Sequence, residues 1–278
     1  MSTGIAAVLL ASMIGATSHS GTTQFHLEDG KNSATSHVSS AVGHDSLSAT
    51  SSNVAALAQT SPTPASFGVF HSVAISAAKL PAASRWQEAR QVDFTGFFSA
   101  DCAARGFSHC DSSFGKRGRD AAAKAEGLGE RDMLDLVNRI INGAMTYRDD
   151  SKVWGLDDYW ATPVEMAGKG AGDCEDYAIA KYWLLRSLGV PDDRLQLVVL
   201  QDTRRQLFHA VLVAHMDGGS YVLDNVSNRL AMDSDYSQYQ PIVSFAGAKN
   251  FIHGFESGVA SVAAMPSDLS LIAPGSGL

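Results

Sequence analysis

The sequence predicts one α+β domain in which a helix carrying a lone cysteine packs against an antiparallel sheet. Apolar residues recur at helical spacing in residues 131–141 and again in residues 174–188. Three extended apolar segments follow within residues 195–224, and a turn-forming sequence joins the last two. Helices that precede a run of hairpin-connected strands are typical of α+β domains.

Composition limits this domain to residues 67–255. Residues 19–66 are rich in Ser, Thr, Ala and Gly and carry few large apolar side chains. Such a segment cannot bury enough surface to offset the entropy of ordering, so we expect a disordered leader there. Residues 256–278 have a similar composition and are expected to form a flexible tail. The segment between them is long enough to bury a sizeable core.

Residues 1–18 form a candidate signal segment. Their apolar run, Ile5 to Ala16, has the length of a signal-peptide core, and small residues follow it. No Lys or Arg precedes the run, although signal peptides normally carry one there. An apolar N-terminus without a targeting role is therefore the alternative. No apolar run is long enough to span a bilayer.

The charge of the chain argues against a nucleic-acid partner. The formal net charge is -8 at pH 7. No stripe of Lys and Arg is present to neutralise phosphates, which is the requirement that dominates nucleic-acid affinity.

The chain has three cysteines, Cys102, Cys110 and Cys174. The spacing of the first two is compatible with a local disulfide in an oxidising compartment. A zinc site that includes His109 is the alternative, but the paired CxxC spacing of such sites is missing. If the first two cysteines pair, Cys174 is the odd thiol, and in an exported chain it becomes a candidate reactive group.

Two helices and an ordered loop are expected before the sheet. The helix over residues 131–141 has an apolar stripe and should support the core. Residues 145–173 combine Gly, Asp and Trp and are predicted to form an ordered loop. The next helix runs to Leu188, because Gly189 and Pro191 then stop it. Cys174 lies in its first turn, on the buried stripe.

The three predicted strands are residues 195–200, 206–215 and 221–224, and the sequence MDGG joins the last two. A two-residue loop places Val211 opposite Asp224 and makes His209 the diagonal neighbour of Asp224. A four-residue loop also puts the histidine and the aspartate on one face. A three-residue loop puts them on opposite faces unless a bulge restores the phase.

Cys174 has neighbours with opposing effects on its thiol pKa. Asp173, Glu175 and Asp176 place negative charge beside it, which raises the pKa. A helix N-terminus lowers the pKa. The sequence alone leaves this conflict open.

Cys174, His209 and Asp224 supply one residue for each role in thiol catalysis. A cysteine nucleophile needs a base to form the thiolate, and the base needs an acceptor that holds its tautomer. Spacing alone favours the alternative that they are a buried helix residue, a strand histidine and a turn aspartate without a catalytic role. His215 lies on the same strand face as His209 and is a competing base.

A resemblance adds to this interpretation. The run GDCEDYAIAKYWLLRSLGV, with DYWATPVE before it and HAVLVAH and YVLDN after it, resembles the bacterial transglutaminase-like cysteine proteinases, the family of the LapG-type periplasmic proteases. The stretch FFSADCAARGFSHC is similar to the N-terminal region of that family. The resemblance covers roughly residues 90–230. It implies a papain-like, transglutaminase-like core, with an N-terminal helical part whose cysteine helix packs on an antiparallel sheet.

The same resemblance implies a Cys-His-Asp triad and a calcium site. The triad positions match Cys174, His209 and Asp224, and His215 falls outside the matched position. The acidic residues that flank the nucleophile match Asp173 and Glu175. Calcium takes carboxylate oxygens, and its charge would cancel the field that opposes thiolate formation.

The sequence does not determine the roles of two further acidic residues. Asp176 is either a metal ligand or a first-turn acid that the helix dipole favours. Asp158, in the preceding loop, is a further candidate for which the resemblance implies nothing.

The resemblance further implies a calcium-dependent periplasmic cysteine endopeptidase. Members of the family cut the N-terminal region of a large biofilm adhesin near an Ala-Ala pair, which controls its release from the cell surface. A membrane receptor that senses cyclic di-GMP sequesters the protease in that system, and is the second expected partner. One alternative is a transglutaminase-type acyl transferase that joins glutamine to amines. The other is a non-catalytic, calcium-dependent binding module.

Overall fold

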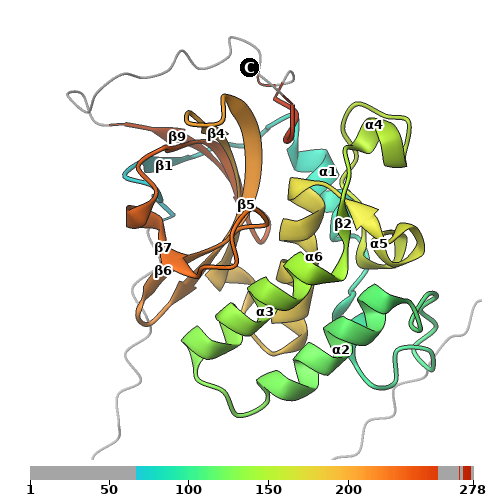
Figure 1. The fold of residues 1–278 in the computed structure, drawn as a ribbon. Helices are drawn as coiled ribbons and strands as arrows, with labels where there is room; N and C mark the ends of the chain where they lie inside the picture. The colour runs from blue at the N-terminus through green and yellow to red at the C-terminus, as the bar shows by residue number, and fades with distance from the viewer. Residues whose placement is uncertain (1–66, 256–268, 270–271, 277–278) are drawn as a thin grey trace, which may run out of the picture. The chain divides into compact units, whose positions relative to one another are not determined.

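A curved seven-stranded sheet lies against a layer of helices (Figure 1). The computed structural model describes residues 67–255, 269 and 272–276. The candidate signal segment (1–18), the predicted leader (19–66) and most of the predicted tail (256–278) lie outside the described residues. The α+β class predicted from the sequence is confirmed.

All neighbouring strands of the large sheet are antiparallel, in the order β1-β9-β8-β4-β5-β6-β7. A separate parallel pair, β2 and β3, precedes the cysteine helix. The strands are β1 (Val73–Ser76), β2 (Thr146–Tyr147), β3 (Ala171–Gly172), β4 (Leu195–Asp202), β5 (Leu207–Met216), β6 (Gly219–Leu223), β7 (Ala231–Met232), β8 (Tyr239–Ala246) and β9 (Lys249–Gly254).

The α-helices of the described residues all precede β4, and α2 and α3 pack side by side. They are α1 (Ala83–Ala89), α2 (Ser113–Ala125), α3 (Glu130–Ala144), α4 (Asp150–Val153), α5 (Pro163–Lys169) and α6 (Cys174–Ser187). Three 3-10 turns connect elements: η1 (Thr95–Phe98), η2 (Asp192–Arg194) and η3 (Asp233–Asp235).

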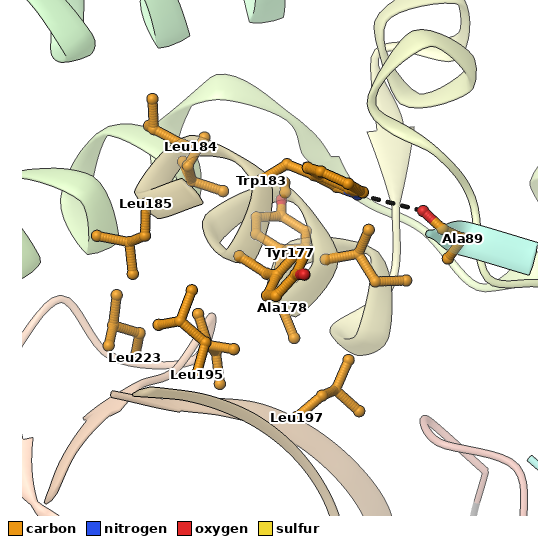
Figure 2. Close-up of a cluster of buried hydrophobic side chains, with 14 of the residues drawn as sticks. Ala89, Tyr177, Ala178, Trp183, Leu184, Leu185, Leu195, Leu197 and Leu223 are labelled. Atoms are coloured by element: carbon orange, nitrogen blue, oxygen red, sulfur yellow. Dashed lines mark hydrogen bonds between the residues drawn. The ribbon is translucent and has the colours of Figure 1, made fainter. Parts of the chain in front are cut away.

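Helix α6 is enclosed by the sheet on one side and by other helices on the other. Every residue from Cys174 to Leu185 is buried, so the helix has no solvent-facing stripe over its first three turns. Figure 2 shows Ala178 and Leu185 of α6 above Leu195 and Leu223 of the sheet. Packing on all sides holds the start of this helix in place.

A hydrogen bond ties α6 to the N-terminal helices as well. The indole Nε1 of Trp183 donates to the carbonyl oxygen of Ala89, at the end of α1, over 3.2 Å (Figure 2). The buried indole therefore keeps a partner for its only polar group.

The prediction of a loop over residues 145–173 is wrong in part, because α4 and α5 form within it. Helix α5 has a capping box between Thr162 and Glu165, with Pro163 in its first turn. Gly170 ends the helix at φ 65°, in the left-handed region that favours glycine. These start and stop signals are present in the sequence, but the helix is only two turns long and its periodicity is weak.

The predicted hairpin is confirmed, and the structure selects the two-residue loop among the loop lengths that the sequence left open. Met216 pairs with Gly219, which leaves a two-residue turn, and the ladder runs to the pair of Leu212 with Leu223. The side chains of His209 and Asp224 consequently share one face of the hairpin.

Cys102 and Cys110 form a disulfide, with their Cα atoms 6.1 Å apart. This finding selects the disulfide over the zinc alternative with His109. Both cysteines are buried and pack in the helical part of the core. In the part of the chain described, no helix combines the length and apolarity needed to cross a bilayer.

Replacing both cysteines, Cys102→Ala with Cys110→Ala, is expected to lower the free energy of unfolding by about 2–3 kcal/mol, because the unfolded chain loses a constraint. Urea unfolding followed by circular dichroism measures it. The parent protein in a strong reductant serves as the matched control and should move toward the variant. An unchanged midpoint in both samples would contradict the structural role of the disulfide.

Candidate active site

Cys174 is the first residue of α6, directly after the N-cap residue Asp173. Its side chain is 1% exposed, and its thiol donates a hydrogen bond to Oε2 of Glu175 over 3.2 Å. Burial, followed by the charge of Asp173, raises the pKa of the Cys174 thiol far above its ordinary value, and the backbone of Ala210 opposes this rise only in part. Of the two opposing effects on the thiol pKa noted in the sequence, the one that raises the pKa is therefore the larger, and the protonated thiol is favoured over the thiolate.

His209 and Asp224 form a buried pair at the other side of the site. Nε2 of His209 donates to Oδ1 of Asp224 over 2.9 Å. The hydroxyl of Tyr239 donates to Oδ2 of Asp224 over 2.5 Å, and the backbone N–H of Val226 donates to Oδ1 over 3.1 Å. Burial raises the pKa of Asp224, but the hydrogen bonds and the charge of His209 outweigh it and bring this pKa below its usual range. Asp224 is therefore a carboxylate that can support an imidazolium.

The three predicted triad residues are not all hydrogen-bonded to one another. His209 and Asp224 are joined, while the thiol of Cys174 is directed to Glu175. Among the described residues, no hydrogen bond links this thiol to the imidazole. Because Nε2 of His209 is held by Asp224, Nδ1 is the ring nitrogen left to accept a proton.

Three buried carboxylates gather beside Cys174: Asp150, Asp173 and Glu175. One oxygen from each lies within 4.8 Å of the others. Among the residues that the structure describes, none is a hydrogen-bond partner of Asp150 Oδ1, Asp173 Oδ1 or Glu175 Oε1. Buried, unpaired carboxylate oxygens are costly without a cation, so these residues fit a hard divalent ion.

The pKa values of the three carboxyl groups show that burying them together is unfavourable for their charged forms. Burial, then the charge of Asp150, raises the pKa of Asp173 to about 8. Burial also raises the pKa of Asp150 to about 6 and, together with Asp173, raises that of Glu175 well above its ordinary value. The carboxyl groups cannot all ionise in a buried site without a compensating positive charge.

Asp150 is the cluster residue that the sequence did not point to. It is the first residue of α4, 23 positions before Asp173 along the chain, and lies in the segment predicted as loop. Its Oδ2 accepts a hydrogen bond from the backbone N–H of Tyr159. Only the packing of α4 beside β3 brings this carboxylate to the start of α6.

The two acids left open by the sequence lie outside this cluster of three. Asp176 Oδ1 accepts a hydrogen bond from the backbone N–H of Ala161 over 2.8 Å. Asp158 forms an ion pair with Arg85 at 3.0 Å and accepts a hydrogen bond from Nε1 of Trp160. Both acids therefore hold the loop that precedes α5.

A family model matches residues 100–246, and its description is bacterial transglutaminase-like cysteine proteinase, BTLCP. The match covers more than half of the chain and contains Cys174, His209 and Asp224. The chain belongs to this family. The resemblance noted from the sequence is confirmed.

Solved structures of LapG from Legionella pneumophila are similar to this chain. One is 28% identical over 50% of this chain and 79% of LapG, with a TM-score of 0.45. An EGTA-treated form is 26% identical over 53% of this chain and 84% of LapG, with a TM-score of 0.45. A calcium-bound form is 22% identical over 69% of this chain and 92% of LapG, with a TM-score of 0.46. No curated protein matches the chain.

Two side chains that the sequence did not single out bind Asp224 and hold it in place. Tyr239, on β8, binds its carboxylate, and the side-chain amide of Asn142, on α3, donates to its carbonyl oxygen over 2.8 Å. Lys181, on α6, is fully buried, and no residue of the described part of the chain is a hydrogen-bond partner of its Nζ. Burial lowers the pKa of Lys181 to about 7, and the charge of Asp224 opposes this shift.

His215, the competing candidate base on β5, uses both ring nitrogens in hydrogen bonds to other residues. One hydrogen bond of 2.7 Å joins its Nε2 to Gln196 Oε1, and one of 2.9 Å joins its Nδ1 to Ser220 Oγ. Burial lowers the pKa of His215 to about 4. Both ring nitrogens are engaged, so this histidine has no free nitrogen to offer as a base.

The burial of His215 predicts acid sensitivity. The unfolded chain takes up a proton at this residue as the pH falls below about 6.5, whereas the folded chain resists until about pH 4. Stability should therefore be lost as the pH falls through this window, by roughly 3 kcal/mol. His215→Gln should flatten the dependence of the urea midpoint on pH between 6.5 and 4. The exposed His71→Gln is the control, and an equal slope in the two variants would contradict the assignment.

Proposed function

We propose that this chain is a calcium-dependent cysteine endopeptidase that uses Cys174, His209 and Asp224. The observation that carries the proposal is the buried pair of His209 with Asp224, 2.9 Å apart, in a chain of the transglutaminase-like cysteine proteinase family. An imidazole held by a carboxylate at one nitrogen is poised to act as a base at the other. Cys174, at the start of the enclosed helix α6, supplies the nucleophile.

The reaction follows from the roles of these groups. Nδ1 of His209 takes the proton of the Cys174 thiol, and the thiolate attacks the carbonyl carbon of a peptide bond. Asp224 stabilises the imidazolium that forms. His209 returns the proton to the leaving amine as the C–N bond breaks. Water, deprotonated by His209, then releases the acyl group and restores the thiol.

The oxyanion of the tetrahedral intermediate needs hydrogen-bond donors. The backbone N–H groups in the first turn of α6, including that of Cys174, have no partners within the helix. A helix N-terminus also favours negative charge. We assign these N–H groups to the oxyanion.

Asp150, Asp173 and Glu175 are the residues that would hold calcium. Their unpartnered oxygens and raised pKa values support the assignment. When bound, the ion supplies positive charge that offsets the field of the carboxylates around the thiol. The unpartnered oxygen of Glu175 is Oε1, whereas the thiol of Cys174 donates to Oε2, so the thiol has to turn away from Oε2 to reach His209.

The family resemblance extends the proposal to a substrate, a location and a regulator. The substrate is the N-terminal region of a large surface adhesin, cut near an Ala-Ala pair, and the place of action is the periplasm. The disulfide between Cys102 and Cys110 supports an oxidising compartment. A membrane receptor that senses cyclic di-GMP is the proposed regulatory partner. An adhesin fragment containing the Ala-Ala pair, and the same fragment with Asp in place of both alanines, test the substrate.

Cys174→Ala is expected to abolish cleavage of this fragment, with a loss of at least about a thousandfold, because no other group can form the acyl-enzyme. Product formation is measured by mass spectrometry, and an unchanged circular dichroism spectrum shows that the variant is folded. Residual proteolysis would contradict the nucleophile. Incorporation of a labelled amine into a glutamine peptide without chain cleavage would instead identify an acyl transferase.

Asp150→Asn and Asp173→Asn are each expected to weaken calcium binding at least tenfold, because each removes a charged ligand from a buried site. Titration calorimetry measures the affinity, and Asp157→Asn, at an exposed position near α4, is the matched control. EGTA should stop cleavage by the parent, and calcium should restore it. Equal affinity in all three variants would place the ion elsewhere, and cleavage that is indifferent to EGTA would refute its role.

A further inference from the structure

Within the described part of the chain, one edge of β5 next to the candidate active site is not paired with another strand. Strand β4 pairs with β5 from Leu207 to Ala214 along one edge. On the other edge, β6 pairs only with the residues from Leu212 to Met216. The first five residues of β5, which include His209, therefore lack a neighbouring strand on the β6 side among the described strands. A free strand edge presents main-chain donors and acceptors that an extended polypeptide can complete.

A segment from the C-terminus of this same chain occupies that edge. The backbone N–H of Phe208 donates to the carbonyl oxygen of Ser276 over 2.9 Å. The N–H of Gly275 donates to the carbonyl oxygen of Phe208, also over 2.9 Å. Both main-chain groups of Phe208 are thus bound by residues more than sixty positions further along the chain.

The segment is anchored by apolar burial as well as by these hydrogen bonds. Ile272 is 5% exposed and Pro274 is also buried. A turn follows the anchor, since the N–H and the hydroxyl of Ser276 both donate to the carbonyl oxygen of Ala273. Residues 272–276 are named the C-terminal strap below.

The occupied edge leads directly to the thiol. The N–H groups of residues two apart on a strand point to the same edge, so Phe208 and Ala210 share it, about 7 Å apart. Helix α6, which begins at Cys174, packs against β5, and the backbone of Ala210 lowers the pKa of the Cys174 thiol, which indicates that the two groups are close. A polypeptide paired with Phe208 therefore lies one step along the strand from the nucleophile.

The strap also lies next to Tyr147 and Asp173, on the side of the candidate active site that precedes α6. A Cβ atom placed on Gly275 would lie 3.4 Å from the hydroxyl of Tyr147 and 3.7 Å from Oδ2 of Asp173. Tyr147 belongs to β2, and Asp173 directly precedes Cys174. The strap thus spans from β5 to the residues before α6, and with it in place Cys174 and His209 are only 1% and 2% exposed.

We propose that the free edge of β5 at Phe208 is the binding site for the main chain of an extended polypeptide, and that the C-terminal strap holds this site until a substrate displaces it. The inference rests on the proposed function, because it gives the peptide substrate of Cys174 its place. The site binds its ligand through main-chain hydrogen bonds, so the expected ligand is an extended polypeptide. The strap is then an intramolecular competitor that limits access to the thiol.

The test measures access to Cys174 in the full-length protein. Iodoacetamide alkylation reports access without any protein substrate, and Cys174 is the free cysteine because the other two form a disulfide. Ile272→Asp removes the apolar anchor and should raise the alkylation rate on the order of tenfold, as the strap opens more often. Ile75→Asp, the same change at an isoleucine that is 58% exposed, is the matched control and should leave the rate unchanged.

A second pair of variants, with smaller changes, controls for a general loss of fold stability. Gly275 has φ 82°, and Gly127 has φ 78° in the turn between α2 and α3. Alanine is strained at both positions, but only Gly275→Ala should accelerate alkylation. A synthetic peptide with the sequence of residues 269–278 should slow alkylation of Ile272→Asp back toward the parent rate. Hydrogen exchange at the Phe208 amide should quicken in the same variant and slow with the peptide.

The outcomes separate this inference from the proposed function. Equal alkylation rates in the parent, Ile272→Asp and Gly275→Ala would overturn the inference. Faster alkylation that the peptide does not reverse would also overturn it, because the strap would then be a structural cap. Reversible acceleration in a protein that cleaves no adhesin fragment would support the site at Phe208 and contradict the endopeptidase.

Discussion

The structure depends on the burial of the start of α6, where a thiol and several carboxyl groups are packed away from the protein surface. Cys174, Glu175 and Asp176 are each at most 1% exposed, and Asp173 is 3% exposed. Burial of groups that carry charge is costly unless they are paired, and here the pKa values of the thiol and its acidic neighbours all rise. The packing that fixes the helix therefore also makes the site dependent on a compensating charge.

Two environments with opposite electrostatic effects meet at the two sides of this helix start. On the side of β5 and β6, hydrogen bonds from His209 and Tyr239 keep Asp224 ionised. On the side of β3 and α4, the unpartnered oxygens of the acidic cluster disfavour ionisation. A cation at the cluster would reverse only the second effect, which would leave the base already prepared. The ion would then control the thiol rather than the histidine.

Much of the fold was predictable because its signals are local. The Asp-Gly turn and the alternation of apolar residues predicted the hairpin, and the two-residue turn that the structure contains places His209 and Asp224 on one face. The close spacing of Cys102 and Cys110 permitted the disulfide that the structure contains. Helix α5 was missed, although its capping residues are present, because a seven-residue helix shows little periodicity. That Cys174 completes a triad with His209 stays a prediction.

The sequence by itself determined the fold class, the family, the presence of the hairpin and the residue types at the site. These features depend on short-range patterns and on a motif that is continuous along the chain. Only the tertiary structure decided that Asp150 joins Asp173 and Glu175, that the thiol turns to Glu175, and that Gly275 lies beside Phe208. Each of these contacts is set by side-chain orientation or by distant segments, and depends on how several elements pack together.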